Sequence, residues 1–328
     1  MSRWCSTATL AAMAAVAVMI ATASVMAQSP AQWPTRRVQV IVPFSPGSAT
    51  DLVPRTVFDS VSARVGQPII IENRAGGGGA PGVTAVTKAE PDGYTILVNS
   101  NSLVTAPAIQ HMPYDPVRDL AGITPLGSVP LVLVIAPDKG IKTLKELVAR
   151  AKANPGAINY AAAGIGTPPH LTAERFRLAA GFQGQLVPFK GAPEALTEVL
   201  AGRVDFYFSP ITPAMAFIRE GKLLALAVSS TKRASALPDV PTTVEAGFPN
   251  SDFDFWIGAL VPKKTPREIV ARIHDATVQG LEDPAVKDKL AQLGVEPMIM
   301  APQDFDARIA REAPIALDLA KAAGIAAK

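Results

Sequence analysis

Short apolar runs alternate with amphipathic stretches along most of this 328-residue chain. Runs rich in Val and Ile are expected strands at 38–42, 69–71 and 95–98. Residues 50–65 have apolar side chains at helical spacing, and a second helical stretch follows the glycine-rich segment 75–82 and ends at Lys88. This β-α-β-α-β rhythm predicts a mostly parallel sheet with helices on its faces.

A second β/α series follows further along the chain. Its expected strands are 158–161, 186–188, 204–208 and 224–228. Its expected helices are 143–153, 169–180, 193–201 and 213–220. Thr143 followed by Glu146 is a capping-box pattern, which predicts that the first of these helices begins there. Helical segments continue from Pro266 to the end of the chain.

Two long apolar runs, 129–137 and 253–261, bracket this second series. We expect the first run to be one extended strand that passes between two lobes, and the second to return the chain. The first lobe is therefore predicted to be discontinuous, with residues 28–130 and 251–328, and the second lobe to contain residues 131–250. A mature chain of about 300 residues is long enough for two such lobes.

Residues 1–27 have the layout of a cleavable signal peptide. Arg3 precedes an apolar stretch at Leu10–Ile20, and Val25–Ala27 places small residues at a cleavage site. A transmembrane anchor is the alternative, but the apolar run is short and rich in alanine. Cys5 is the only cysteine and lies in this leader, so the mature chain has no disulfide and no thiol chemistry.

Composition and motif content exclude several classes of function. The chain is 48% hydrophobic and 18% charged with a formal charge of +3, and it has no basic run, so we expect no nucleic-acid partner. The 3 histidines are scattered without metal-ligand spacing, and no Gly-x-Ser-x-Gly elbow is present. We therefore expect no metal, no cofactor and no catalytic residues. The four glycines at 76–79 lack the Lys-Ser/Thr of a phosphate loop, which favours a tight turn or close helix packing.

Two segments of similar type each follow an expected strand and open a helix. They are 43–51 and 163–170, and both are rich in small and hydroxyl-bearing residues. Free amide groups at a helix start favour a carboxylate or phosphate, and ligands of open α/β sheets bind beyond the carboxyl ends of the strands. Both loops can also be plain helix caps, and the motif chemistry leaves the two interpretations open. Asp51 is favoured as a cap over a ligand contact, and His170 as a neutral, hydrogen-bonded side chain.

A series of short motifs resembles the Bug family, the TctC-like solute receptors of tripartite tricarboxylate transporters. The similarity covers nearly all of the mature chain in the same order and at similar spacing. The landmarks are Trp33-Pro34, Val42-Pro43-Phe44 with Pro46-Gly47 and Ala49-Thr50-Asp51, Glu72-Asn73-Arg74, Pro91-Asp92-Gly93-Tyr94-Thr95, Pro113-Tyr114-Asp115-Pro116, Asn159-Tyr160-Ala161, Gly164 to His170, Pro188-Phe189-Lys190-Gly191, Gly202-Arg203-Val204-Asp205, Gly221-Lys222-Leu223 and Leu237 to Thr242.

The resemblance implies a type II periplasmic-binding-protein fold, with two Rossmann-like lobes and a ligand cleft between them. It implies a periplasmic receptor that binds a small carboxylate, an organic acid or amino acid, by hinge closure and delivers it to a membrane permease through transient contact. Carried over residue by residue, the resemblance names as ligand-binding Phe44, Ser45, Ser48, Ala49, Thr50, Asp51, Gly164, Gly166, Thr167 and His170, with Asn99, Ser100, Lys190 and Ser209 at the lobe edges. We expect a monomer.

Three departures from the family pattern affect the expected site. Ser48 stands where a second glycine is usual, Phe189 replaces a frequent tyrosine, and Ser209 stands where Asp or Asn is common. The distal end of the solute is therefore not predicted. A periplasmic sensor subunit that signals solute occupancy to a membrane kinase is the alternative function, because it needs the same closure. An exported hydrolase is disfavoured by the absence of a nucleophile elbow or a metal cluster.

Overall fold

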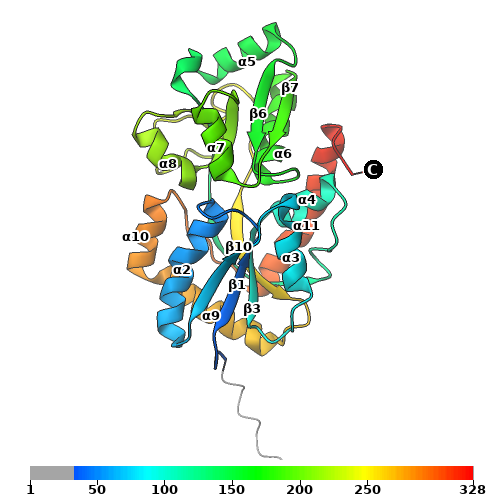
Figure 1. Ribbon diagram of the computed structural model, residues 1–328, viewed down its shortest axis with the longest axis vertical. Helices are drawn as coiled ribbons and strands as arrows, with labels where there is room; N and C mark the ends of the chain where they lie inside the picture. Colours follow the sequence, from blue (N-terminus) through cyan, green and yellow to red (C-terminus); the bar gives the residue numbers. More distant parts are fainter. Residues whose placement is uncertain (1–32, 328) are drawn as a thin grey trace, which may run out of the picture. The chain divides into compact units, whose positions relative to one another are not determined.

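The computed structural model describes residues 33–327, and these form two five-stranded sheets. The strand orders are β2-β1-β3-β10-β4 in the first sheet and β7-β6-β8-β5-β9 in the second, and Figure 1 shows helices around both. The expected signal peptide, 1–27, lies outside the described residues. Among the described residues, no helix is long and apolar enough to span a membrane.

The first sheet is built mainly by the N-terminal part of the chain. Its strands are β1 (Val38–Val42), β2 (Ile69–Asn73), β3 (Thr95–Ser100), β4 (Leu120–Ser128) and β10 (Trp256–Pro262). Its helices are α2 (Ala49–Val65), the 3-10 turn η1 (Gly77–Gly79), α3 (Ala80–Thr87), α4 (Ser102–Ile109), α9 (Arg267–Glu282), α10 (Pro284–Gln292) and α11 (Pro302–Ala322). Strand β1 pairs in parallel with β2 and β3, whereas β10 is antiparallel to β3 and β4.

The second sheet is built from the middle of the chain. Its strands are β5 (Leu131–Ile135), β6 (Ile158–Ala162), β7 (Gly184–Pro188), β8 (Phe206–Pro210) and β9 (Leu224–Val228). Its helices are the 3-10 turn η2 (Pro137–Lys139), α5 (Leu144–Ala153), α6 (Pro168–Ala180), α7 (Ala192–Leu200) and α8 (Ile211–Arg219). The expected cap of α5 is present, because the Thr143 hydroxyl accepts a hydrogen bond from the Glu146 amide.

Both sheets contain one strand that runs against its neighbours, so the expected mostly parallel sheet is mixed. Strand β5 is antiparallel to β8 and β9, as β10 is to β3 and β4. These are the two strands that the chain forms directly after crossing from one sheet to the other. The βαβ units remain parallel, as the alternating pattern predicted.

The chain crosses between the sheets in two short segments that are hydrogen-bonded to each other. Strand β4 ends at Ser128 and β5 begins at Leu131, so the single extended strand expected at 129–137 is wrong. Pro130 has no amide hydrogen and interrupts the ladder at this point. The Val129 amide donates to the Phe255 carbonyl at 2.8 Å, which ties the outgoing segment to the returning one.

Continuous apolar strands covered on both faces make up the core of each sheet. Residues of β1, β3, β5 and β10 are almost all buried, which is typical of sheets with helices on both sides. The Phe305 ring of α11 packs edge-on to Trp256 at 5.0 Å and occupies the space over Gly122 and Gly258. Burying such a ring contributes roughly 1.5–3 kcal/mol. In the second sheet, Phe176 has the same role against Phe206 and neighbouring rings.

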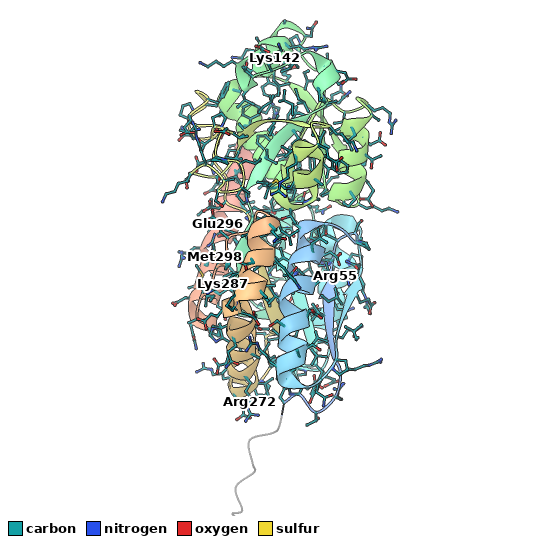
Figure 2. The ribbon with its side chains drawn as sticks, turned by 90° about the vertical axis from the view of Figure 1, so that its left-hand side faces the viewer. Arg55, Lys142, Arg272, Lys287, Glu296 and Met298 are labelled. Atoms are coloured by element: carbon teal, nitrogen blue, oxygen red, sulfur yellow. The ribbon has the colours of Figure 1, made fainter. Side chains whose placement is uncertain are left out.

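Three helices of the C-terminal part, α9, α10 and α11, pack against helices of the earlier part of the chain. Helix α2 packs along α9 and α10; Figure 2 shows these helices side by side, with Arg55 labelled on α2 and Lys287 on α10. Gly280 permits the close approach, since a Cβ there would lie 2.8 Å from a Val61 methyl carbon. Helix α11 packs on α4, and its end also contacts α6, so Leu171 and Ala320 share one apolar cluster.

Candidate functional site

The loop between β1 and α2, residues 43–48, ends with unused hydrogen-bond donors. The amides of Asp51 and Leu52 bond to the Ser48 carbonyl, whereas those of Ala49 and Thr50 have no acceptor among the described residues. The Ser48 hydroxyl is buried and also has no partner there, although serine at this position normally caps the helix. The start of α2 therefore offers three free donors and the positive end of its dipole.

Asp51 holds this loop in shape from inside. Its carboxylate accepts hydrogen bonds from the Gly47 amide, the Asn73 amide group and the Arg55 guanidinium at 2.8–2.9 Å. Burial raises the pKa of this carboxyl, but these hydrogen bonds and the Arg55 charge outweigh burial and hold the pKa below its ordinary value. Asp51 lines neither of the two cavities described below, and its carboxylate bonds within the first lobe, to groups around the loop.

The loop between β6 and α6, residues 163–167, leads to a helix start that is poorer in free donors than the start of α2. Helix α6 begins with Pro168 and Pro169, which have no amide hydrogens, so His170 provides the first unpaired amide of the helix. The Thr167 hydroxyl donates to the Gly164 carbonyl at 2.8 Å and is no longer free as a donor. The two loops are thus alike in sequence type, but the helix starts that follow them are unequal in the donors they can offer an anion.

His170 is a buried, neutral side chain. Its Nδ1 accepts a hydrogen bond from the Gly166 amide at 3.2 Å, which places the ring proton on Nε2. Burial lowers the pKa of His170 to about 4, so the imidazole is uncharged at neutral pH. The expectation of a neutral, hydrogen-bonded histidine is confirmed, and its ring supplies no positive charge to a ligand.

The two loops face each other across a small inner cavity. Its volume is about 20 Å³, which is room for about one water molecule. A pocket for a small-molecule ligand usually has several hundred Å³, so a larger solute can enter only if the loops separate. The cavity is lined by Phe44, Ser48, Ala49, Thr50, Ser100, Ala163, Thr167, Pro168, Pro169, Ala192, Pro210 and Phe255.

Within the described residues, three hydrogen bonds join the part of the chain around the first sheet to the part around the second sheet in this region. The Ser45 hydroxyl donates to Glu194 Oε1 at 2.9 Å, and the Gln110 amide group donates to the Ile165 carbonyl at 3.2 Å. The third runs from the Thr105 hydroxyl to the Gly166 carbonyl. Gly166 fits only because it lacks a side chain, since a Cβ there would lie 2.6 Å from the Ala106 Cα.

A larger outer cavity of about 630 Å³ lies beside the inner one, and Phe44 and Ala163 line both. The glycines at 76–79 form one wall, all with positive φ angles that only glycine adopts freely. Phe189, Lys190 and Glu194 form part of the opposite wall. Lys190 is exposed and has no ion-pair partner within residues 33–327. The outer cavity can therefore hold an apolar body together with a second charged group.

The other predicted site residues lie at different distances from these cavities. Ser100 lines the inner cavity and Gly164 the outer one. Asn99 is buried behind Ser100, and its Oδ1 accepts from the Ser100 amide at 2.8 Å. Ser209 is buried in β8, donates to the Pro210 carbonyl at 2.9 Å and lines neither cavity.

Several lining residues were not predicted from the sequence. Gln110, Glu194 and Phe255 come from elements far from the two loops, and nothing in their local sequence marks them. The glycines at 76–79 were assigned to a turn, and their position on the cavity wall is additional. Among the described residues, no group of His, Cys, Asp and Glu is arranged to hold a metal ion.

Two mixed α/β sheets joined by paired crossings, with a cavity between strand-end loops, define a two-lobed solute-binding protein. Residues 53–323 match the sequence profile of the tripartite tricarboxylate transporter family receptors. The chain therefore belongs to this receptor family, whose members are periplasmic binding proteins and not enzymes.

Sequence relatives and solved structures agree with this assignment. BugT of Bordetella pertussis is 35% identical over 304 residues, which is 92% of this chain and 93% of BugT. An R. palustris protein solved with adipate has a TM-score of 0.87 and 30% identity, over 90% of this chain and 100% of that one. MatC from Rhodopseudomonas palustris, solved with bound malate, has a TM-score of 0.83 and 31% identity, over 88% and 99%.

Proposed function

We propose that this receptor captures one small carboxylate, an organic acid or an amino acid, in the periplasm and delivers it to a membrane permease of the tripartite tricarboxylate type. In this proposal residues 1–27 are a cleaved export signal. The lobes are 28–130 with 251–328, and 131–250, and they close on the solute by bending at the paired crossings. The mature receptor acts as a monomer.

The observation that carries the proposal is the group of free donors at the start of α2. The amides of Ala49 and Thr50 and the hydroxyl of Ser48 have no described protein partner and lie at the inner cavity. A hydrogen bond to a charged group contributes roughly 1.5–3 kcal/mol, so three supply about 5–9 kcal/mol. A micromolar site needs about 8 kcal/mol, which the donors together with the helix dipole can reach.

The remaining predicted residues take different parts in the proposed site. Phe44, Thr167 and Ser100 shape the inner cavity around the carboxylate, and the His170 amide adds a donor from the second lobe. Asp51, Gly166 and Asn99 act by holding the loops in place. The body of the solute extends into the outer cavity, where Lys190 is positioned for a second carboxylate. The dicarboxylates adipate and malate in two related receptors support this assignment.

Solute entry requires opening, because the inner cavity of about 20 Å³ has no room for a carboxylate with a carbon chain. Closure then forms the contacts between Ser45 and Glu194 and between Thr105 and Gly166. A solute that bonds to both lobes stabilises the closed form by its differential affinity for that form.

A thermal-shift screen of the mature chain against about a hundred organic acids and amino acids tests the proposal. A true solute raises Tm with concentration according to RT ln(1 + [L]/Kd) and is recovered unchanged. The matched amide of each active acid serves as a control and should not stabilise the protein. If no acid shifts Tm, carboxylate capture is rejected. Pull-down against permease subunits and against membrane kinases then separates transport from signalling.

A further inference from the structure

A third cavity, of about 490 Å³, lies in the first lobe between the sides of α9 and α11. It opens at the ends of β4 and β10, and its walls include Gly122, Lys263, Thr265, Arg267 and Asp306. Because β10 runs antiparallel to β3, the residues that follow β10 lie at the edge of the sheet opposite to the carboxyl ends of β1 and β3. The cavity is therefore remote from the proposed solute site; in Figure 2, the label for Arg272 of α9 marks this end of the lobe.

The free hydrogen-bonding groups on these walls are mainly donors. Arg267 has no hydrogen bond or ion pair among the described residues, and the Gln303 side chain has none either. Thr265 is 6% exposed, and its hydroxyl has no partner in the described part of the chain. A buried hydroxyl left without a partner is unfavourable, and a hydrogen bond to a ligand would satisfy it.

The acidic side chain on the cavity wall does not cancel this excess, and Glu268 and Asp304, in the first turns of α9 and α11, do not line the cavity. Asp306 is the carboxylate on the wall, and both of its oxygens are engaged. Its Oδ1 accepts from the Gly122 amide at 2.6 Å, and its Oδ2 accepts from Lys263 Nζ at 3.3 Å. Lys263 remains 41% exposed, so it retains donors for a second partner. His274 adds no free donor, because its Nε2 bonds to the Met300 carbonyl at 3.2 Å and its Nδ1 lies 3.1 Å from Asp275 Oδ1.

The first turns of α9 and α11 add backbone donors at the same place. The amides of Arg267 and Glu268 have no backbone acceptor at the start of α9, and those of Gln303 and Asp304 have none at the start of α11. Both helices are long, with 16 and 21 residues, so each contributes a positive dipole end. Two cations, two helix starts and an unpartnered hydroxyl thus converge on one cavity.

We propose that this cavity is a second binding site, specific for a compact oxyanion of the phosphate or sulfate type. Arg267 provides the paired guanidinium donors that suit a tetrahedral oxyanion, Thr265 donates from the buried end, and Lys263 shares its charge between Asp306 and the anion. The phosphate can be free or can belong to a lipid headgroup, and both sources present the same oxygens. The site is independent of the proposed solute function.

Calorimetric titration of the mature chain with inorganic phosphate, and with sulfate, tests the proposal at low ionic strength. Arg267→Gln should weaken phosphate binding about tenfold or more, and Thr265→Val about fivefold. Thr265→Val keeps the side-chain volume and removes no protein hydrogen bond, so it should fold normally. Lys289→Gln on α10 removes the same charge outside the cavity and should change the affinity less than twofold.

Two further experiments complete the test. The first distinguishes this site from the proposed solute site, and the second distinguishes free phosphate from a lipid headgroup. Ser48→Ala should leave phosphate affinity unchanged; phosphate binding that is lost in Ser48→Ala but retained in Arg267→Gln overturns the proposal. Sedimentation with phosphatidylglycerol vesicles, repeated with Arg267→Gln, identifies a headgroup if the variant loses vesicle binding. The proposal also fails if neither phosphate, sulfate nor vesicles bind.

Discussion

Replacing Ser48 by alanine should weaken solute binding without weakening the fold. Ser48 is 5% exposed, and its hydroxyl has no partner among the described residues. A serine at a helix start usually caps the helix, and its loss then costs about 1 kcal/mol. Here the side chain makes no capping hydrogen bond. The free energy of unfolding should therefore stay within about 0.5 kcal/mol of the parent value.

The loss in affinity follows from the role proposed for the hydroxyl. A hydroxyl that donates to a carboxylate contributes roughly 1.5–3 kcal/mol, so its removal should raise Kd about 10- to 150-fold. The same variant removes a buried, unpaired polar group from the closed form. The solute-free closed form should thus become slightly easier to reach, which reduces the loss toward the lower end of this range.

Thr167→Val is the matched comparison in the other loop. The Thr167 hydroxyl already donates to the Gly164 carbonyl, so valine removes a hydrogen bond within the protein and no donor to the solute. Stability should fall by about 0.5–1.5 kcal/mol, and affinity should change less than in Ser48→Ala. Titration calorimetry and urea unfolding give both quantities for both variants. Equal affinities of Ser48→Ala and the parent, within twofold, refute the reasoning.

Three other changes have expected results. Gly191→Ala places a methyl group 2.9 Å from the Ser45 side chain, at an extended φ of −175° that any residue adopts. The variant should close less readily and bind the solute more weakly, while the Tm of the solute-free protein should remain unchanged. A lower Tm of the solute-free variant contradicts this. Burial lowers the pKa of His170 to about 4, so the unfolded chain binds a proton before the folded chain does, and the free energy of unfolding decreases as pH falls from 6.5 to 4. His170→Gln should remove about 2–3 kcal/mol of this decrease, measured by urea unfolding at several pH values. An equal decrease in the variant and the parent would exclude this role of His170. Asp51→Asn should cost about 2–3 kcal/mol in unfolding experiments, because the Arg55 partner is lost; a neutral change rules out the capping role.

Much of the fold follows from the sequence because its strands and amphipathic helices are local patterns. The two elements that were missed, β4 and α4, lack such a pattern. Strand β4 contains Pro125 and two glycines, and it forms because it is an edge strand of the first sheet with β10 as its neighbour. Helix α4 is buried on nearly all sides and contains Pro107, and it is a helix because α11 and η1 pack against it.

The candidate site was predictable to the extent that it is local. Small residues after a strand and before a helix mark both loops, and both lie at the inner cavity. Whether each donor is free depends on distant partners and could not be inferred: Ser45 is engaged by Glu194, 149 positions away. The carboxylate of Asp51 is likewise satisfied by Asn73, 22 positions away.

The two prolines that open α6 imply an order of events. Since the start of α6 presents fewer free amide hydrogens than the start of α2, we expect an arriving carboxylate to bind first at α2, before the other lobe covers it. The first lobe then mainly sets the association rate, and the second lobe mainly sets the dissociation rate. We expect changes around Ser48 to slow association, whereas changes around Thr167 shorten the lifetime of the complex.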